Sequence, residues 1–407
     1  MEEGQPQSPG GPPLRPEDCV EELLKFTLQS SVTGTLGGGL DIGLSKEYCS
    51  NLLQHNHHDH PSSPSSNSAS PTPPEFSQGV PLYPLYKRLA SALCHSIASG
   101  ALITSQYRNM AFIQEDSSRK QKEDEWIQLV MVKGSELLNV LKNVEFELHV
   151  QEPFFSQFRD GLKTVEGRYA RGDYNRIVSG ALILLNKCLV LQVQDVHRYA
   201  SFSEMLEAES LSKVLPGVET IEEGVQIYRK FYSEEKERSN GVLAICVAKS
   251  AAQLYIPLTS MISGLSYGGI QRLLGFVHTV GSSVEALPPS RSTLLSSFLL
   301  PHNPKVKGST LTEGARALAK HVNRSSSKYW GTFGGSDSNK NRLAKDVISL
   351  LIADCCWQNM HIVPPHGAVY EIRIADGYGA RWSADGTKFI GFLEPYMEDG
   401  HSKGWKH

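Results

Sequence analysis

A short segment of the chain, GLKTVEGR at residues 161–168, places charged side chains beside a run of apolar residues. Lys163, Glu166 and Arg168 lie close together in this segment, and the first of them follows Gly161 by two residues. Charged groups next to a core are costly unless they are paired or take part in chemistry. This spacing therefore marks the first candidate site.

Each of the three charged side chains suits a different chemical task. Arg168 offers five fixed donors for a phosphate or a base edge. A partly buried Lys163 near an arginine is expected to have a lowered pKa, which would let it act as a base or a nucleophile. Glu166 can neutralise the pair or move protons. The structural alternative is a Glu166–Arg168 ion pair that fixes the strand, with Lys163 solvated.

Basic and aromatic residues are frequent around this segment, and binding of single-stranded RNA requires both kinds. They occur at Arg159, Lys163, Arg168, Tyr169, Arg171, Tyr174 and Arg176. The acidic residues Asp160, Glu166 and Asp173 dilute the charge, so phosphate contacts alone predict a modest affinity. Stacking on Tyr169 or Tyr174 would suit single-stranded RNA or a flipped base.

The flanking sequence predicts the elements that would position these residues. FELHVQ, from residue 146, alternates apolar and polar side chains, and residues 181–186, 189–196 and 241–248 are strand-like runs. Helices are expected at 201–211 and 220–235. This pattern predicts an α+β unit or a small barrel over 146–249. His197, Arg198 and Tyr199 end a predicted strand and would lie at its rim or simply on the surface.

Gly161, Lys163, Glu166 and Arg168 match the G-x-K-x-x-E-x-R motif of the ASCH family. The order of elements over 146–249 resembles that domain too, as found in plant RNA-binding ASCH-domain proteins and activating signal cointegrator-like proteins. The resemblance implies a small β-barrel similar to the PUA domain, with a cleft over it. A helix would end at Gly161 in a left-handed turn. Lys163 would point into the cleft, with Glu166 and Arg168 on one face of the next strand.

Members of the ASCH family are suspected RNA binders, and a few bacterial members hydrolyse acetylated cytidine or cut RNA. The resemblance therefore implies an RNA-binding cleft formed by Lys163, Glu166, Arg168, Tyr169, Arg171 and Tyr174. The hydrolytic relatives use the motif lysine, a threonine three residues later and a glutamate on a downstream helix. Lys163 matches the lysine and Glu209 the glutamate. Glu166 stands where the threonine is expected, although Thr164 lies nearby, and a carboxylate does not easily replace a hydroxyl nucleophile.

The N-terminal part is predicted to be a helical unit over residues 17–145, where helical spacing recurs at 19–28, 47–53, 83–103 and 122–144. Residues 1–16 are expected to be a disordered tail, and the Ser/Pro-rich segment 55–79 a disordered insertion. The histidines at the start of this insertion would bind a metal only weakly: His55, His57, His58 and His60. We expect no metal site and no cofactor.

Residues 251–407 are predicted to form a separate C-terminal α+β module of unknown function. Thr310 and Glu313 form a capping box for one helix. Asp-Gly pairs at 376–377 and 385–386 predict hairpins. His361 and His366 lack the spacing of a metal pair. The aromatic and polar residues of this module either pack on its glycines or line a pocket: Tyr329, Trp330, Arg373, Tyr378, Arg381, Trp382, His401, Trp405 and His407.

The composition limits the remaining possibilities. The chain has 407 residues with 40 basic and 43 acidic side chains, which predicts two or three domains and no overall attraction to nucleic acid. It contains no apolar run of membrane-spanning length and no recognisable targeting peptide. Seven cysteines without disulfide or metal spacing indicate buried, inert thiols in a reducing compartment, the cytosol or the nucleus.

Three functions remain open for this predicted multidomain α+β protein. The leading prediction is RNA binding through the barrel cleft, in RNA metabolism, translation or transcription coactivation. The first alternative is a cytidine-type amidohydrolase or a ribonuclease that acts through Lys163, with Glu209. The second alternative is an interaction scaffold that docks a protein partner on residues 17–145.

Overall fold

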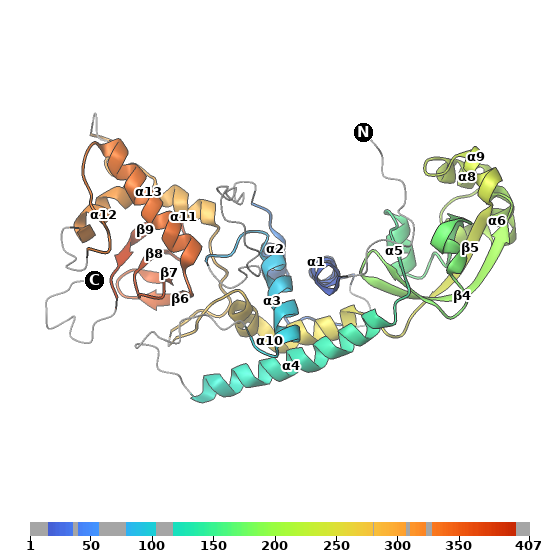
Figure 1. Cartoon of the computed structure of the whole chain (residues 1–407), viewed down its shortest axis with the longest axis horizontal. Helices are drawn as coiled ribbons and strands as arrows, with labels where there is room; N and C mark the ends of the chain where they lie inside the picture. Colours follow the sequence, from blue (N-terminus) through green and yellow to red (C-terminus); the bar gives the residue numbers. More distant parts are fainter. Residues whose placement is uncertain are drawn as a thin grey trace. The chain divides into compact units, whose positions relative to one another are not determined.

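The structure is a computed structural model that describes residues 15–35, 40–56, 79–102, 117–279, 281–306, 310–322 and 328–395 (Figure 1). Contacts within the chain divide it into two compact units. The first unit comprises Met1–Ser30, Leu36–Leu40 and Val132–Met261, and the second comprises Ser31–Thr35, Asp41–Met131 and Ile262–His407. Most of the predicted tail and insertion lies outside the described residues, as do His401, Trp405 and His407.

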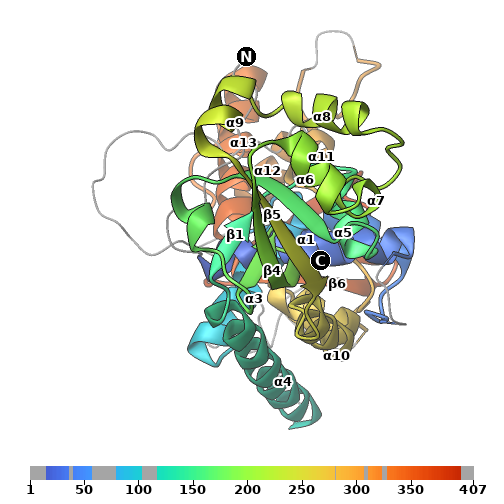
Figure 2. The ribbon, with the colours of Figure 1, turned by 90° about the vertical axis from the view of Figure 1, so that its right-hand side faces the viewer.

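The first unit contains a curled five-stranded sheet within the continuously described segment 117–279 (Figure 2). Its strand order is β1 (Phe146–Leu148), β3 (Leu182–Leu185), β4 (Leu189–Tyr199), β5 (Val242–Lys249) and β2 (Val165–Tyr169). β1 pairs with β3 in parallel, and all other neighbours are antiparallel. Within that segment no pairing joins β1 to β2, so the sheet is a half-barrel and β2 is an edge strand.

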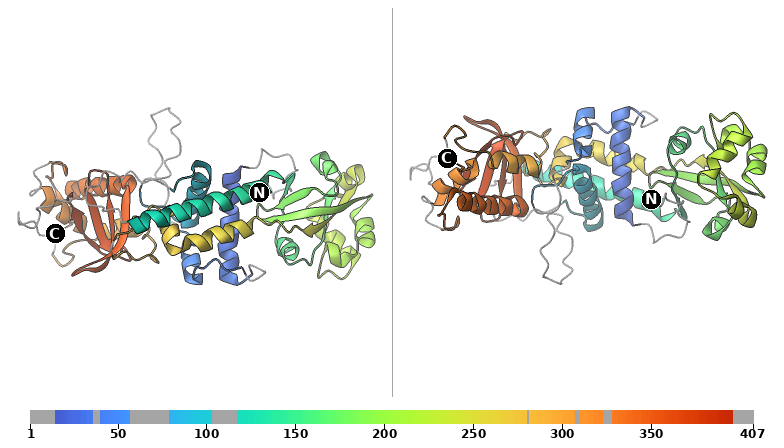
Figure 3. Two further views of the ribbon diagram at one scale, coloured as in Figure 1. Left: turned by 90° about the horizontal axis from the view of Figure 1, so that it is seen from below. Right: turned by 90° about the horizontal axis from the view of Figure 1, so that it is seen from above.

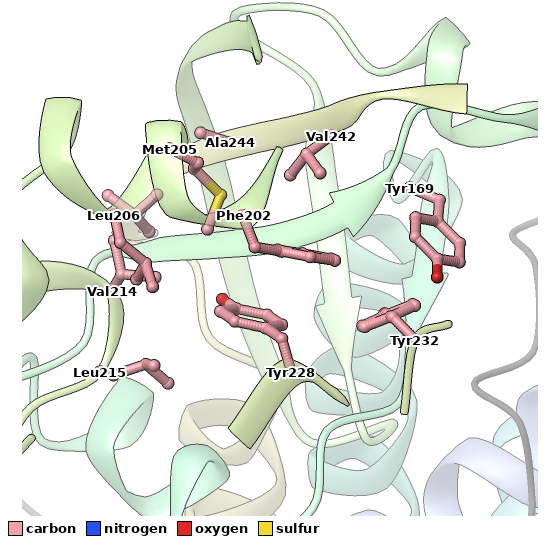
Figure 4. Close-up of a cluster of buried hydrophobic side chains, with 11 residues drawn as sticks. Tyr169, Phe202, Met205, Leu206, Val214, Leu215, Tyr228, Tyr232, Val242 and Ala244 are labelled. Atoms are coloured by element: carbon pink, nitrogen blue, oxygen red, sulfur yellow. The ribbon is translucent and has the colours of Figure 1, made fainter. Parts of the chain in front are cut away.

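Short helices after β4 pack against the sheet: α6 (Phe202–Ala208), α7 (Leu211–Val214), α8 (Ile221–Arg229) and α9 (Glu234–Asn240). Ser201, Thr220 and Ser233 cap α6, α8 and α9, because each side chain accepts a hydrogen bond from a backbone N–H three residues later. Under these helices the rings of Phe202 and Tyr228 stack with centroids 4.2 Å apart (Figure 4). Two further helical elements complete this region, α5 (Phe154–Arg159) and the 3₁₀ segment η2 (Gly172–Arg176).

The helices of the N-terminal part belong to both units. α1 (Pro16–Thr33) places Phe26 edge-on against Phe155 of α5, with centroids 5.8 Å apart. α2 (Lys46–Leu53) and α3 (Leu85–Ser99) lie in the second unit. α4 (Ser117–Lys142) and α10 (Tyr255–Leu273) each have residues in both units. Within the second unit their portions run side by side, and Glu123 of α4 forms an ion pair with Arg272 of α10 at 2.7 Å (Figure 3).

The second unit also contains a four-stranded antiparallel sheet within residues 328–395, in the order β6 (Trp357–Val363), β7 (Gly367–Arg373), β8 (Gly379–Ser383) and β9 (Phe389–Leu393). The Asp-Gly pairs lie between β7 and β8 and between β8 and β9, which confirms both predicted hairpins. Helices pack on one face of this sheet: α11 (Arg291–Phe298), α12 (Glu313–Val322) and α13 (Asp337–Asp354). The buried Trp382 belongs to this core and donates to the Leu294 carbonyl of α11.

The expected α+β architecture is confirmed, with a helical N-terminal region, a half-barrel and a C-terminal sheet covered by helices. The predicted capping box is shifted: α12 begins at Glu313, and the Thr312 hydroxyl, not that of Thr310, accepts from the Ala315 N–H. The reason is that Thr310 precedes the helix by three residues and bonds instead to Asp337 and Asn341 through its backbone.

All seven cysteines lie within the described residues and are free thiols. Cys19, Cys49, Cys188, Cys355 and Cys356 are buried, which confirms the expectation of mostly buried thiols. Among the helices that the structure describes, none combines the length and the apolar character needed to cross a membrane.

Gly167 of β2 allows the close approach of α8, and we predict that Gly167→Ala destabilises the half-barrel. A Cβ atom there would lie 2.6 Å from the Tyr228 hydroxyl and 2.8 Å from Met205 Cε. Such overpacking costs about 1–3 kcal/mol, measurable by chemical denaturation followed through tyrosine circular dichroism.

Gly391 of β9 is the matched control, since a Cβ atom there meets nothing within 4 Å. Gly391→Ala should be neutral or slightly stabilising because alanine loses less backbone entropy than glycine in a strand. Equal stability of the Gly167→Ala variant and the wild type would contradict the packing argument.

Candidate functional site

The candidate motif occupies the connection between α5 and β2. α5 ends at Arg159, and Gly161 has a left-handed φ of +74°, which confirms the predicted helix end. The backbone N–H groups of Leu162 and Lys163 then donate to the Gln157 carbonyl, so the chain turns back on the helix. This turn directs Lys163 toward the edge strand.

Lys163 is buried, with 3% of its surface exposed, and its ammonium group is hydrogen-bonded. It donates to the Val165 carbonyl at 2.8 Å and to the Val214 carbonyl of α7, and it forms an ion pair with Glu166 at 3.3 Å. The preceding carbonyl, that of Thr164, faces β5, so the Val165 carbonyl points away from the sheet. The Lys163 ammonium therefore donates a hydrogen bond to a carbonyl at the edge of β2, with which another strand could otherwise pair.

The pKa of Lys163 is lowered, as the sequence predicts. Burial disfavours the ammonium and is the largest cause, while Glu166 acts in the opposite direction and Arg168 adds to the lowering. The rings of Phe158 and Phe154 lie 5.1 and 5.6 Å from Nζ and exclude water from it.

Arg168 is the second buried cation, with 4% of its surface exposed. Its Nη2 atom forms an ion pair with Glu166 at 2.9 Å and donates to the His149 carbonyl, also at 2.9 Å. Burial opposes the charge, but Glu166 outweighs it and the pKa of Arg168 is raised. The Nε atom is buried and has no hydrogen-bond partner among the described residues.

Glu166 thus holds two buried cations from one carboxylate, and its side chain is only 12% exposed. The predicted Glu166–Arg168 ion pair is present, whereas Lys163 is buried in it and not solvated. Together the three groups form a closed ion-pair network along the outer edge of β2, which we call the edge network.

The other predicted RNA-contacting residues divide into buried and exposed groups. Tyr169 is buried and donates to the Ser233 carbonyl at 2.6 Å, and Tyr174 is buried with its ring 5.9 Å from the Arg168 guanidinium carbon. Arg171 is exposed. The structure brings Lys163, Glu166 and Arg168 into contact and leaves Arg171 facing solvent.

Arg171 has exposed basic neighbours that the motif does not include. Arg198, on β4, donates from Nη2 to the Asn175 side chain at 2.6 Å, and Asn175 donates to the Ala170 carbonyl at 3.2 Å. Arg176 follows Asn175 in η2, has 76% of its side chain exposed and pairs with Asp173 at 3.3 Å. Arg198 thus contacts Asn175, Arg176 is the chain neighbour of Asn175, and Arg171 follows Ala170; we call these three exposed arginines the arginine rim.

Glu209, the predicted catalytic glutamate, lies in a different cluster. Its Oε1 atom is 2.5 Å from His197 Nδ1 and 2.7 Å from the Tyr199 hydroxyl, and its Oε2 atom is 3.6 Å from Cys246 Sγ. Burial, reinforced by Glu209, raises the pKa of Cys246 to about 11. Among the described residues Lys163 and Glu209 share no hydrogen-bond or ion-pair partner.

Sequence reasoning did not identify Cys246 or the role of His197. Cys246 lies within an apolar strand run and carries no spacing signal, and His197 appeared only as a rim residue. Only the strand register places them together, because Asp195 pairs with Cys246 and His197 pairs with Ala244.

A further charged cluster lies on β6, β7 and β8 of the C-terminal sheet. Glu371 is buried and contacts His361 Nε2 at 3.2 Å, Arg373 Nε at 2.7 Å and Arg381 Nη2 at 2.6 Å. Burial raises the pKa of Glu371, but His361 and the two arginines outweigh it and hold the value at about 2. Glu371 had no signal in the sequence, since it stands alone in a β-rich run.

The C-terminal residues that were expected either to pack on glycines or to line a pocket are partly in contact with one another among the described residues. Tyr329 and Tyr378 stack with centroids 3.6 Å apart, and Trp330 packs edge-on against Tyr378. Arg373 and Arg381 converge on Glu371. Trp382 belongs to the core beneath the helices and does not line this cluster.

Removing the Glu166 charge should destabilise the half-barrel strongly. Glu166→Gln leaves the buried ammonium and guanidinium groups without a carboxylate, which costs about 3–5 kcal/mol. No tryptophan lies in residues 146–250, so the measurement is hydrogen–deuterium exchange of peptides that cover β2. The exposed Glu207 supplies the control, and Glu207→Gln should change stability by less than about 0.5 kcal/mol. Unchanged exchange in Glu166→Gln would show that the edge network does not support the strand.

Comparison with known proteins finds two domain models that match parts of the chain. The ASCH domain model matches residues 148–250, and a model described as the CdiA C-terminal tRNase toxin domain matches residues 301–394. No curated protein matches the sequence.

Two similar solved structures cover the same part of the chain. Hypothetical protein PH0355 is 40% identical over 26% of this chain and 97% of its own length, with a TM-score of 0.25. Protein PF0455 from Pyrococcus furiosus is 42% identical over 26% of this chain and 96% of its own length, with a TM-score of 0.24. With the motif, the half-barrel and the family model in agreement, residues 148–250 are an ASCH domain, and the chain belongs to the ASCH domain family.

Proposed function

We propose that this protein binds single-stranded RNA through its ASCH domain, on the arginine rim. The ASCH match suggests RNA binding in general. The observation that carries the specific proposal is the set of three exposed arginines, Arg171, Arg176 and Arg198, the last of which contacts Asn175. Guanidinium groups bind phosphate oxygens and offer flat faces on which unpaired bases stack.

The edge network acts below this surface in the proposal. Lys163 and Arg168 expose too little surface to reach a phosphate directly. Arg168 instead lies over the Tyr174 ring, and Tyr174 belongs to η2, which also carries Asn175 and Arg176. The buried charges thus fix the strand and the 3₁₀ segment that present the arginine rim.

Replacing two rim arginines should weaken RNA binding and its salt dependence together. For the Arg171→Ala/Arg198→Ala variant of the full chain we expect at least about tenfold weaker binding to a single-stranded RNA, because two phosphate contacts are lost. Each neutralised phosphate contributes about 0.7 to the slope of log affinity against log salt, so the magnitude of the slope should fall by about 1.4. The measurement is fluorescence anisotropy over a range of salt concentrations.

Arg238 provides the matched control in the same unit, because it is an exposed arginine of α9 that pairs with Glu234. Arg238→Ala should leave both affinity and slope unchanged. Identical binding by the Arg171→Ala/Arg198→Ala variant and the wild type would overturn the proposed surface.

A second function, RNA cleavage by the C-terminal module, is favoured by one specific observation. Residues 301–394 match a domain model described as a tRNase toxin, and that segment contains Glu371 in contact with His361, Arg373 and Arg381. A carboxylate, an imidazole and two guanidinium groups are the components that cleave RNA without a metal ion.

In this second proposal the buried Glu371 orients the His361 imidazole, and His361 accepts the proton of the ribose 2′-hydroxyl, whose oxygen attacks the neighbouring phosphorus atom. The bond from phosphorus to the 5′-oxygen breaks, and His361 passes that proton to the leaving oxygen. The products are a 2′,3′-cyclic phosphate and a free 5′-hydroxyl. Arg373 and Arg381 stabilise the charge on the phosphate oxygens.

Cleavage of transfer RNA by the full chain in the presence of EDTA tests the second proposal. We expect the wild type to produce cyclic-phosphate ends, and His361→Gln to slow the reaction by about 10²-fold or more because the general acid is lost. His366→Gln is the control, since His366 is exposed in the turn between β6 and β7. Absence of cleavage by the wild type, or equal rates for the His361→Gln variant, would refute it.

A further inference from the structure

The strand register of the half-barrel brings two metal-binding side chains together on its helix-packed face. β4 and β5 are antiparallel neighbours, in which Asp195 pairs with Cys246 and His197 pairs with Ala244. Side chains two residues apart on a strand share a face, so Cys246 and His197 are diagonal neighbours across the pair. Ala244 packs in the cluster beneath α6, which identifies this face (Figure 4).

The helix above these strands adds a third group. α6 packs on both β4 and β5, and Glu209 is its C-terminal cap residue. The Glu209 carboxylate lies between the other two side chains, with Oε1 at 2.5 Å from His197 Nδ1 and Oε2 at 3.6 Å from Cys246 Sγ. One imidazole nitrogen, one carboxylate oxygen and one sulfur atom therefore lie within 4.8 Å of one another.

Two neighbouring side chains contact these groups and orient them, as residues hydrogen-bonded to metal ligands commonly do. Asp195 Oδ2 is 3.1 Å from His197 Nε2, which leaves Nδ1 directed at Glu209 and Cys246. The Tyr199 hydroxyl donates to Glu209 Oε1 at 2.7 Å. A carboxylate on the far nitrogen of a histidine fixes its tautomer and ring orientation, and such partners strengthen metal binding by about 10–100-fold.

We propose that His197, Glu209 and Cys246 bind one zinc ion, with Asp195 and Tyr199 as positioning residues. A set of imidazole, thiolate and carboxylate ligands suits zinc better than the harder ions magnesium and calcium. At typical zinc bond lengths, tetrahedral ligand atoms lie about 3.3–3.7 Å apart, which small side-chain rotations reach from the observed positions. His197 has 44% of its side chain exposed, so an ion can enter from solvent.

Three protein ligands leave the fourth position of a tetrahedral ion open for a water molecule or a substrate atom. The zinc site is separate from the arginine rim: Arg198 pairs with Leu243 and lies on the opposite strand face from His197. Zinc binding at this site therefore does not depend on RNA binding, and each of the two proposals can fail without the other.

Cobalt(II) and zinc titration of the full chain tests the site. The His-rich segment could bind metal by itself, so every variant is made in a background with His55, His57, His58 and His60 replaced by alanine. Cobalt(II) should bind with one-to-one stoichiometry and give a sulfur-to-metal charge-transfer absorption, which zinc should abolish by displacement. Cys246→Ser should remove that absorption, and His197→Ala should weaken binding strongly.

Two further variants separate metal binding from a general structural effect. Cys94→Ser removes the other partly buried cysteine and should leave the cobalt spectrum unchanged. Asp195→Asn should keep the absorption but weaken affinity by about 10–100-fold, since it removes only the orienting carboxylate. Absence of the charge-transfer absorption in the background protein, or its persistence in Cys246→Ser, would overturn the proposal. Circular dichroism of each variant verifies folding.

Discussion

The ASCH domain depends on one carboxylate, that of Glu166, which lies between two buried cations. Desolvating an ammonium and a guanidinium group is costly, and a single glutamate offsets that cost through ion pairs at 3.3 and 2.9 Å. Backbone carbonyls of Val165, Val214 and His149 satisfy further donors. The network joins the edge strand, α7 and the segment after β1, three parts of the domain that are distant in sequence.

This arrangement explains why the motif has its particular spacing. Gly161 ends α5 in a left-handed turn, which lets Lys163 reach an edge carbonyl of β2. Glu166 and Arg168, two residues apart on one strand, then share a face and meet side by side. A charged edge also blocks pairing with another strand. The charged residues of such a motif can therefore shape a surface without touching a ligand themselves.

The sequence predicted the parts of the structure that depend on local patterns. Strand runs, the two Asp-Gly hairpins and the helix end at Gly161 were all found, because each is encoded by neighbouring residues. The lowered pKa of Lys163 also followed from the expected burial and the nearby Arg168. The position of the capping residue at Thr312 differs by two residues from the prediction, since several hydroxyl side chains compete at a helix start.

The clusters that sequence reasoning missed all require tertiary register. Glu209 meets Cys246 only because α6 packs over the β4–β5 pair, and Glu371 meets Arg381 only because β7 pairs with β8. The burial of Tyr169 and Tyr174 was missed for a related reason: an aromatic residue beside basic residues has the same local pattern on a surface and in a core. The spacing of residues along a single sequence does not reveal these contacts between elements that are distant in the chain.

The proposed function is RNA binding at the arginine rim of the ASCH domain, with buried charges supporting that surface from below. Ultraviolet crosslinking of the full chain to single-stranded RNA, followed by mass spectrometry of the crosslinked peptides, measures this directly. The predicted result is crosslinking within residues 171–176 and 197–199. Crosslinked peptides confined to other parts of the chain would contradict the account.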